Sequence, residues 1–140
     1  MAEISSVAVD VDKSTEGVWF DYDNGIRLKI ASISNPKFTE WIRTKIGKSP
    51  SRRRRDLNAF DTPEMREGVA LHVLKDWGDD TTFDGKKRKY TPAFGKELFD
   101  DPRYKSFYFD VLGFAGDVEA FRTECVEADA GNSEASSNGD

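Results

Sequence analysis

Apolar residues recur at helical spacing over residues 101–128. Asp101 suits a helix cap and Pro102 suits the first turn, where its missing N–H would have no partner. The residues that recur at three- and four-residue steps are Tyr104, Phe107, Tyr108, Val111, Leu112, Ala115, Val118, Phe121 and Cys125. The pattern predicts one long helix. Within it, Gly113 and Gly116 would allow either a close crossing by another helix or a local bend.

Alternating apolar and polar residues predict a β-hairpin over residues 18–33. Asn24 and Gly25 separate the two alternating runs, and this pair favours a type I′ turn, which needs positive φ at both central residues. From Ile26 to Ile30 every second residue is apolar and the residues between are basic. Two strands alone are marginal in water, so we expect the hairpin to pack on helices or to pair with another element.

Three further helices are predicted between the hairpin and the long helix. The first runs from Ser34 to Gly47, the second from Thr62 to Gly78, and the third is short and covers residues 92–98. Each begins with a residue that can cap a helix followed by proline. Together with the hairpin, these helices predict a mainly α-helical α+β fold, in which the hairpin is followed by a bundle of about four helices and the termini are disordered.

Polar segments connect and flank these elements. Residues 78–91 predict a small β-like loop. Residues 1–17 are weakly patterned, which favours a flexible N-terminal arm over an edge strand because aspartate is a poor strand former. Residues 129–140 lack large apolar side chains and predict a disordered polar tail. We therefore expect a single globular domain over residues 18–128.

The composition suits a small protein that folds without metal or disulfide. A chain of 140 residues with 12% aromatic residues can build one genuine core. The single cysteine, Cys125, cannot form an internal disulfide and suits a reducing cytosol. The sequence contains neither an apolar run of membrane-spanning length nor the charge pattern of a signal peptide. We expect a soluble protein of the cytoplasm.

Charge argues against nucleic-acid binding by the chain as a whole. The net charge is −5, and phosphate neutralisation needs a basic surface. The run Arg52–Arg55 is the exception, but no aromatic residues interleave with it to stack on bases. A solvated loop or a protein contact is the favoured interpretation of this run.

Motifs for catalysis and metal binding are incomplete. A calcium loop starting at Asp80 would place Thr82 at the third position and Thr91 at the twelfth, where a bidentate glutamate is needed. His72 and Cys125 are single residues on different predicted helices, and a nucleophilic pair needs a third orienting group. We therefore expect no enzyme activity, no cofactor and no bound metal.

The abundance of rings favours a protein that binds other proteins. Aromatic anchors carry much of the energy at such interfaces. The rings expected to bind a partner are Trp77, Tyr104, Phe107, Tyr108, Phe114 and Phe121. The alternative is that all of them are core residues.

A series of short motifs also occurs in a characteristic order. The series comprises Ser34-Asn35-Pro36-Lys37-Phe38, the aliphatic segment that ends at Trp77-Gly78, Asp84-Gly85, Tyr90-Thr91-Pro92, Asp101-Pro102-Arg103-Tyr104, and Phe121-Arg122 through Glu127-Ala128-Asp129. In this order, the run from Val69 to Asn132 resembles the tail assembly chaperones of long-tailed, siphophage-type bacteriophages. The resemblance extends over the chain from Val18 to Asp129. The Arg52–Arg55 run and the cluster Lys86–Lys89 are not part of that pattern.

The resemblance implies a non-enzymatic chaperone of tail morphogenesis. Such proteins bind the tape-measure protein, keep it soluble and help to recruit tail-tube subunits, in many cases through a longer form made by frameshifting. It further implies homo-oligomers, action in the host cell cytoplasm and absence from the mature virion. One alternative is a structural virion component such as a head–tail connector or tail-terminator protein. A second is a small regulatory protein that mimics nucleic acid, although the acidic residues are scattered among 21 Lys and Arg.

Overall fold

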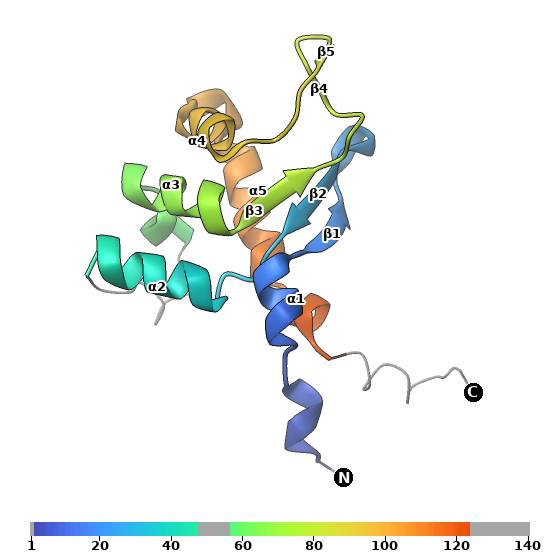
Figure 1. Cartoon of the computed structure of the whole chain (residues 1–140), viewed down its shortest axis with the longest axis vertical. Coiled ribbons are helices and arrows are strands. Elements are labelled where there is room, and N and C mark those ends of the chain that lie inside the picture. The colour runs from blue at the N-terminus through green and yellow to red at the C-terminus, as the bar shows by residue number, and fades with distance from the viewer. Residues whose placement is uncertain (1, 48–56, 124–140) are drawn as a thin grey trace.

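The computed structural model describes residues 2–47 and 57–123 (Figure 1). A three-stranded antiparallel sheet in the order β1-β2-β3 lies beside a group of helices. The strands are β1 (Val18–Asp21), β2 (Arg27–Ile30) and β3 (Leu74–Trp77). The main helices are α2 (Pro36–Lys45), α3 (Pro63–His72), α4 (Pro92–Asp100) and α5 (Lys105–Ala115). The predicted α+β fold, mainly helical and with an early hairpin, is confirmed.

The predicted hairpin is formed by β1 and β2. Val18 pairs with Ile30 and Asp21 pairs with Arg27. The turn, which also forms the short helix η2 (Asp23–Gly25), has φ of 63° at Asn24 and 78° at Gly25. Positive φ at both positions is what the Asn-Gly pair predicted.

The second predicted helix was wrong in its last turn, because α3 ends at His72 and the chain continues as β3. Leu74 pairs with Ile30 and Trp77 pairs with Leu28 on the free side of the hairpin. A short apolar run is compatible both with the end of a buried helix and with a buried strand. Periodicity alone therefore could not distinguish the two structures. Strand β3 adds a third strand to the hairpin. This addition stabilises the sheet, because two strands alone are marginal in water.

Helices α2, α3 and α4 begin as the sequence predicted. A side-chain oxygen accepts a hydrogen bond from a backbone N–H in the first turn of each helix, and a proline follows the cap. The pairs are Asn35 with Phe38 at 3.0 Å, Thr62 with Met65 at 3.2 Å, and Thr91 with Phe94 at 3.1 Å. Helix α3 packs between α2 and α4.

The long C-terminal helix predicted over 101–128 is also corrected. The described part consists of η5 (Pro102–Tyr104), α5, and η6 (Val118–Phe121). Helix α5 ends at Ala115, and the N–H of the following Gly116 bonds to the carbonyl of Leu112. A Cβ added at Gly113 would meet nothing within 4 Å, so no helix among the described residues crosses closely there. Cys125 and the tail over 129–140 lie outside the described residues.

The first 17 residues differ from the expected arm or edge strand. They form η1 (Ile4–Val7) and α1 (Val11–Glu16), and this segment lies against η6. The N–H of Asp10 bonds to the Phe121 carbonyl at 2.8 Å, and the N–H of Thr123 bonds to the Ala8 carbonyl at 3.3 Å. This contact joins two segments more than a hundred residues apart, which no local pattern could reveal.

The predicted polar β-like loop is a short ribbon that projects from the top of the molecule in Figure 1. Strands β4 (Thr82–Phe83) and β5 (Lys86–Lys87) pair antiparallel. Asp84 and Gly85 form the turn between them with φ of 52° and 82°.

The core lies between the sheet, α5 and the α2–α3–α4 layer. The largest fully buried side chains include Tyr108, Phe38, Leu28, Ile30, Met65 and Leu112. Gly68 of α3 allows this packing, because a Cβ there would lie 2.6 Å from the Trp41 ring of α2. The sheet and α5 face each other across this core. The site described next lies at the edge between them.

Candidate functional site

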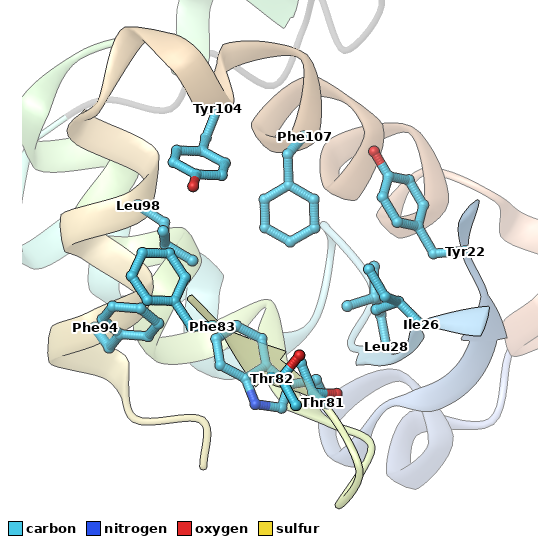
Figure 2. Close-up of a pocket in the computed structure, with 11 residues that line it drawn as sticks. Tyr22, Ile26, Leu28, Thr81, Thr82, Phe83, Phe94, Leu98, Tyr104 and Phe107 are labelled. Atoms are coloured by element: carbon cyan, nitrogen blue, oxygen red, sulfur yellow. The ribbon is translucent and has the colours of Figure 1, made fainter. Parts of the chain in front are cut away.

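An apolar pocket of about 220 Å³ opens between the hairpin, the ribbon and the start of α5 (Figure 2). Its lining is mainly aromatic and aliphatic: Tyr22, Ile26, Leu28, Trp77, Thr81, Thr82, Phe83, Phe94, Leu98, Tyr104 and Phe107. Concave apolar surfaces with few polar groups are the usual form of binding sites. We take this pocket as the candidate functional site.

One wall of the pocket comes from the hairpin. Figure 2 shows Tyr22, Ile26 and Leu28 grouped on this side, across from the α4 residues. The Tyr22 ring meets Phe107 edge-on at a centroid distance of 5.6 Å, and its hydroxyl donates a 2.6 Å hydrogen bond to Asp110 of α5. Burial and the neighbouring Asp110 carboxylate raise the pKa of Tyr22, so this hydroxyl stays protonated and keeps donating at neutral pH.

The opposite wall is a cluster of rings from β3, the ribbon and α4. Phe94 meets Phe83 at 5.0 Å and Trp77 at 5.8 Å, in both cases nearly perpendicular. The Trp77 indole N–H donates to the Arg88 carbonyl at 2.7 Å, and the Arg88 guanidinium lies 3.7 Å from the Phe94 ring centroid. Edge-to-face pairs and a stacked cation stabilise ring positions beyond simple burial. The base of the ribbon is therefore held firmly.

The pocket lining carries no carboxylate, imidazole, thiol or amine. Its polar groups are the two threonine side chains, the Trp77 indole N–H and the Tyr22 and Tyr104 hydroxyls. Such a lining can bind apolar side chains but supplies no group suited to acid–base chemistry at neutral pH.

A second, shallower depression adjoins the pocket on the other side of Tyr22. We call it the aspartate groove. It has a cavity volume of about 590 Å³ and is lined by Asp21, Tyr22, Asp23, Phe109, Asp110, Gly113, Phe114 and Asp117. We call its half-buried rings the floor and its four exposed aspartates the rim. No group of three or more potential ligands placed to hold a metal ion occurs in residues 2–47 and 57–123.

The structure brings three of the six expected partner-binding rings together. Trp77, Tyr104 and Phe107 all line the pocket, and Phe114 lies in the aspartate groove next to it. Tyr104, Phe107 and Phe114 are half-buried, so each leaves part of its ring accessible.

The other expected anchors are core residues rather than accessible rings. Tyr108 and Phe121 are each 1% exposed, and the Tyr108 hydroxyl donates to the Phe60 carbonyl. Trp77 lines the pocket but is only 6% exposed. Helical periodicity identifies an apolar stripe, but only the elements packed on that stripe decide which of its rings stay accessible.

Sequence reasoning missed Tyr22, Phe83 and Phe94 as site residues. Each lies on a different element from the long C-terminal stripe, and their convergence depends on how the hairpin and the ribbon meet α4 and α5. The one local signal was an aromatic residue beside each of the two predicted turns, at Tyr22 and Phe83.

The remaining chemical candidates are His72, Cys125 and Arg52–Arg55. His72 is half-buried near the Trp41 ring, and burial together with Lys75 and Lys37 lowers its pKa. Cys125 and Arg52–Arg55 lie outside the described residues. Within residues 2–47 and 57–123, no helix has the length and apolar character needed to span a bilayer.

Comparison with known proteins places the chain in a family. No curated protein and no solved structure matches it. The family model of the YdaY prophage protein matches residues 61–132, just over half of the chain. The matched segment includes α3, β3, the ribbon, α4 and α5, and hence all of the pocket except its hairpin wall. The chain belongs to the YdaY prophage protein family and is of phage origin.

Proposed function

We propose that this protein is a phage tail assembly chaperone. It binds the tape-measure protein, keeps it soluble in the host cytoplasm, helps to recruit tail-tube subunits and leaves before the virion is complete. Two findings support the proposal: membership of a prophage protein family, and a ring-lined apolar pocket at the rim of the domain. The pocket is the observation that carries it.

The pocket suits a side chain presented by a helix. A cavity of about 220 Å³ takes one large aliphatic or aromatic residue. Tape-measure proteins are long and helical with apolar faces, and a helix presents anchors at three- and four-residue steps. One such anchor enters between Tyr22 and Phe94, beside the half-buried rings of Tyr104 and Phe107. Binding of this kind shields the apolar side chains of the tape-measure helix from water and involves no chemical reaction.

The lining supports a binding role rather than catalysis. Burial of an apolar anchor is driven by the hydrophobic effect, which needs no charged group in the pocket. Phe83, Tyr104 and Phe107 are half-buried, so a bound helix would complete their burial. Interface hot spots commonly consist of such a small cluster of rings.

The direct test is co-expression with the tape-measure protein encoded by the same prophage, followed by a solubility assay and a pull-down. We expect soluble tape-measure protein only when this chain is present. The informative variants are Phe83→Ala and Tyr104→Ala, which shorten pocket rings that are already partly exposed. We expect each to weaken capture by about tenfold or more, as hot-spot truncations do.

Trp19→Ala is the matched control. Trp19 is 41% exposed on β1, is absent from the pocket lining, and packs against the Arg27 guanidinium at 4.9 Å. Its truncation should leave capture unchanged. If the tape-measure protein stays insoluble and no complex forms, the chaperone proposal is wrong. Purified particles should then be searched for the protein, since its presence there would support a structural virion component such as a connector or terminator.

A further inference from the structure

The aspartate groove is open and its floor is apolar. Phe109 and Phe114 of α5 and Tyr22 of the hairpin are all half-buried. Gly113 lies between the two α5 rings and leaves open space, because a Cβ there would meet nothing within 4 Å. The groove therefore has both exposed ring surface and room for another chain.

The rim of the groove is negative and largely uncompensated. Asp23, Asp110 and Asp117 form no ion pair with any residue of the described ranges, whereas Asp21 lies 3.6 Å from Arg27. The hydrogen bond that Asp110 accepts comes from the Tyr22 hydroxyl, which carries no charge. A positively charged segment would relieve this concentration of like charge.

The ribbon is the opposite in shape and charge. Lys86, Lys87, Arg88 and Lys89 are all exposed, and none forms an ion pair with a carboxylate in the described part of the chain. Asp84 at the turn is the single acidic residue between Thr82 and Lys89. The ring cluster around Phe94 holds the base of the ribbon, so the tip is presented on a fixed stem that projects from the molecule (Figure 1).

We infer that the ribbon of one copy docks in the aspartate groove of a second copy. The stems of Lys86, Lys87 and Lys89 would lie over the rings of the floor while their ammonium groups meet the rim carboxylates. Arg88 stays over its own Phe94 ring and holds the ribbon in place. Lysine side chains beside aromatic rings and aspartates are complementary in both apolar area and charge. The ribbon and the groove are both present on this chain, so a second copy is sufficient as the partner.

This contact joins two different surfaces and is therefore heterologous. Contacts of this type form rings when the rotation closes and open chains when it does not. The inference does not rest on the proposed function, because it concerns copies of this chain alone. It leaves the apolar pocket on the other side of Tyr22 free to bind a partner helix.

Reciprocal charge reversal tests the contact on the purified full chain. The groove variant is Asp23→Lys with Asp117→Lys, which spares the Tyr22–Asp110 hydrogen bond; the ribbon variant is Lys87→Glu with Lys89→Glu. Sedimentation velocity across a concentration series should show that the wild type associates, and that salt weakens the association because exposed charges are screened. In each variant alone, the dissociation constant of the self-complex should rise at least about tenfold.

Mixing the two variants should restore association, since each supplies the surface that complements the other. Placing both reversals on one chain should restore it as well. Glu67→Lys with Glu97→Lys is the control for the groove variant, because it changes the net charge by the same amount and sign at exposed residues on α3 and α4. Circular dichroism checks that every variant is folded. A monomeric wild type, an equal loss in the control, or no recovery on mixing would each overturn the inference.

Discussion

The Tyr22 hydroxyl donates a hydrogen bond of 2.6 Å to the carboxylate of Asp110, a residue 88 positions further along the chain. This contact ties the hairpin to α5. It also separates the apolar pocket from the aspartate groove, because Tyr22 lines both. A single side chain thereby links the fold to its two candidate interaction surfaces.

Removing the hydroxyl should cost a measurable part of the stability. Tyr22→Phe keeps the ring against Phe107 but loses the hydrogen bond, so we expect a loss of about 1 kcal/mol in the free energy of unfolding. Urea denaturation measures it. Tyr104→Phe is the matched control, since no hydrogen bond of the Tyr104 hydroxyl occurs within the described residues. Equal stability of the two variants would show that the Tyr22–Asp110 bond contributes nothing.

Two glycines should respond in opposite directions to alanine. In Gly68→Ala the new Cβ would lie 2.6 Å from the Trp41 ring, so either that ring or helix α2 must shift. We expect a loss of about 1–3 kcal/mol from this overpacking. In Gly113→Ala the Cβ meets open space within a helix, which should raise stability by up to about 1 kcal/mol. Thermal unfolding of both variants would reveal the contrast, and two changes of the same sign would contradict it.

Alkaline pH should destabilise the protein through its buried tyrosines. Burial is the main cause that raises the pKa of both Tyr108 and Tyr90 above the usual value near 10. Their contribution is therefore complete below pH of about 10 and is lost as the pH rises toward the folded-state pKa. Tyr108→Phe should reduce the slope of stability against pH in this range. Denaturation series of the wild type and the variant from pH 8 to about 11.5 would test this prediction. Equal slopes of stability against pH would show that Tyr108 does not contribute to the alkaline loss.

Acid should weaken an ion-pair network at the side of α3. Arg66 contacts Asp61 at 2.6 Å and Asp100 at 2.8 Å. The hydrogen bond from Lys105, with help from Arg66, lowers the pKa of Asp61; for Asp100, burial opposes the shift, but Lys96 and Arg66 outweigh it and lower the pKa.

Both carboxylates therefore stabilise the fold above their unfolded-state pKa near 4, and this contribution disappears as the pH falls through the lowered values. Arg66→Met should lose about 1–2 kcal/mol at pH 7 and show a smaller further loss in acid. Urea midpoints at pH 7 and pH 3 measure both effects. An equal acid-induced loss in the variant and the wild type would exclude Arg66 from the network.

Local sequence determined the helix starts and the turns. Local interactions fix the helix caps at Asn35, Thr62 and Thr91 and the turn at Asn24-Gly25. Because these interactions span only a few residues, they can be predicted without the tertiary structure. The mainly helical α+β class followed from these signals together with hydrophobic periodicity. So did the apolar stripe that includes Tyr104 and Phe107.

Tertiary structure alone decided strand β3, the end of α5 and the location of the pocket. Leu74 and Trp77 extend as a strand because the free side of β2 offers backbone partners, and that side exists only after the hairpin has formed. Tyr108 became a core residue because its ring packs against Phe99 of α4 and its hydroxyl bonds to the Phe60 carbonyl, whereas Phe107, its neighbour, stayed half-buried at the pocket. Contacts between residues distant in sequence choose between such alternatives, and a local pattern carries no information about them.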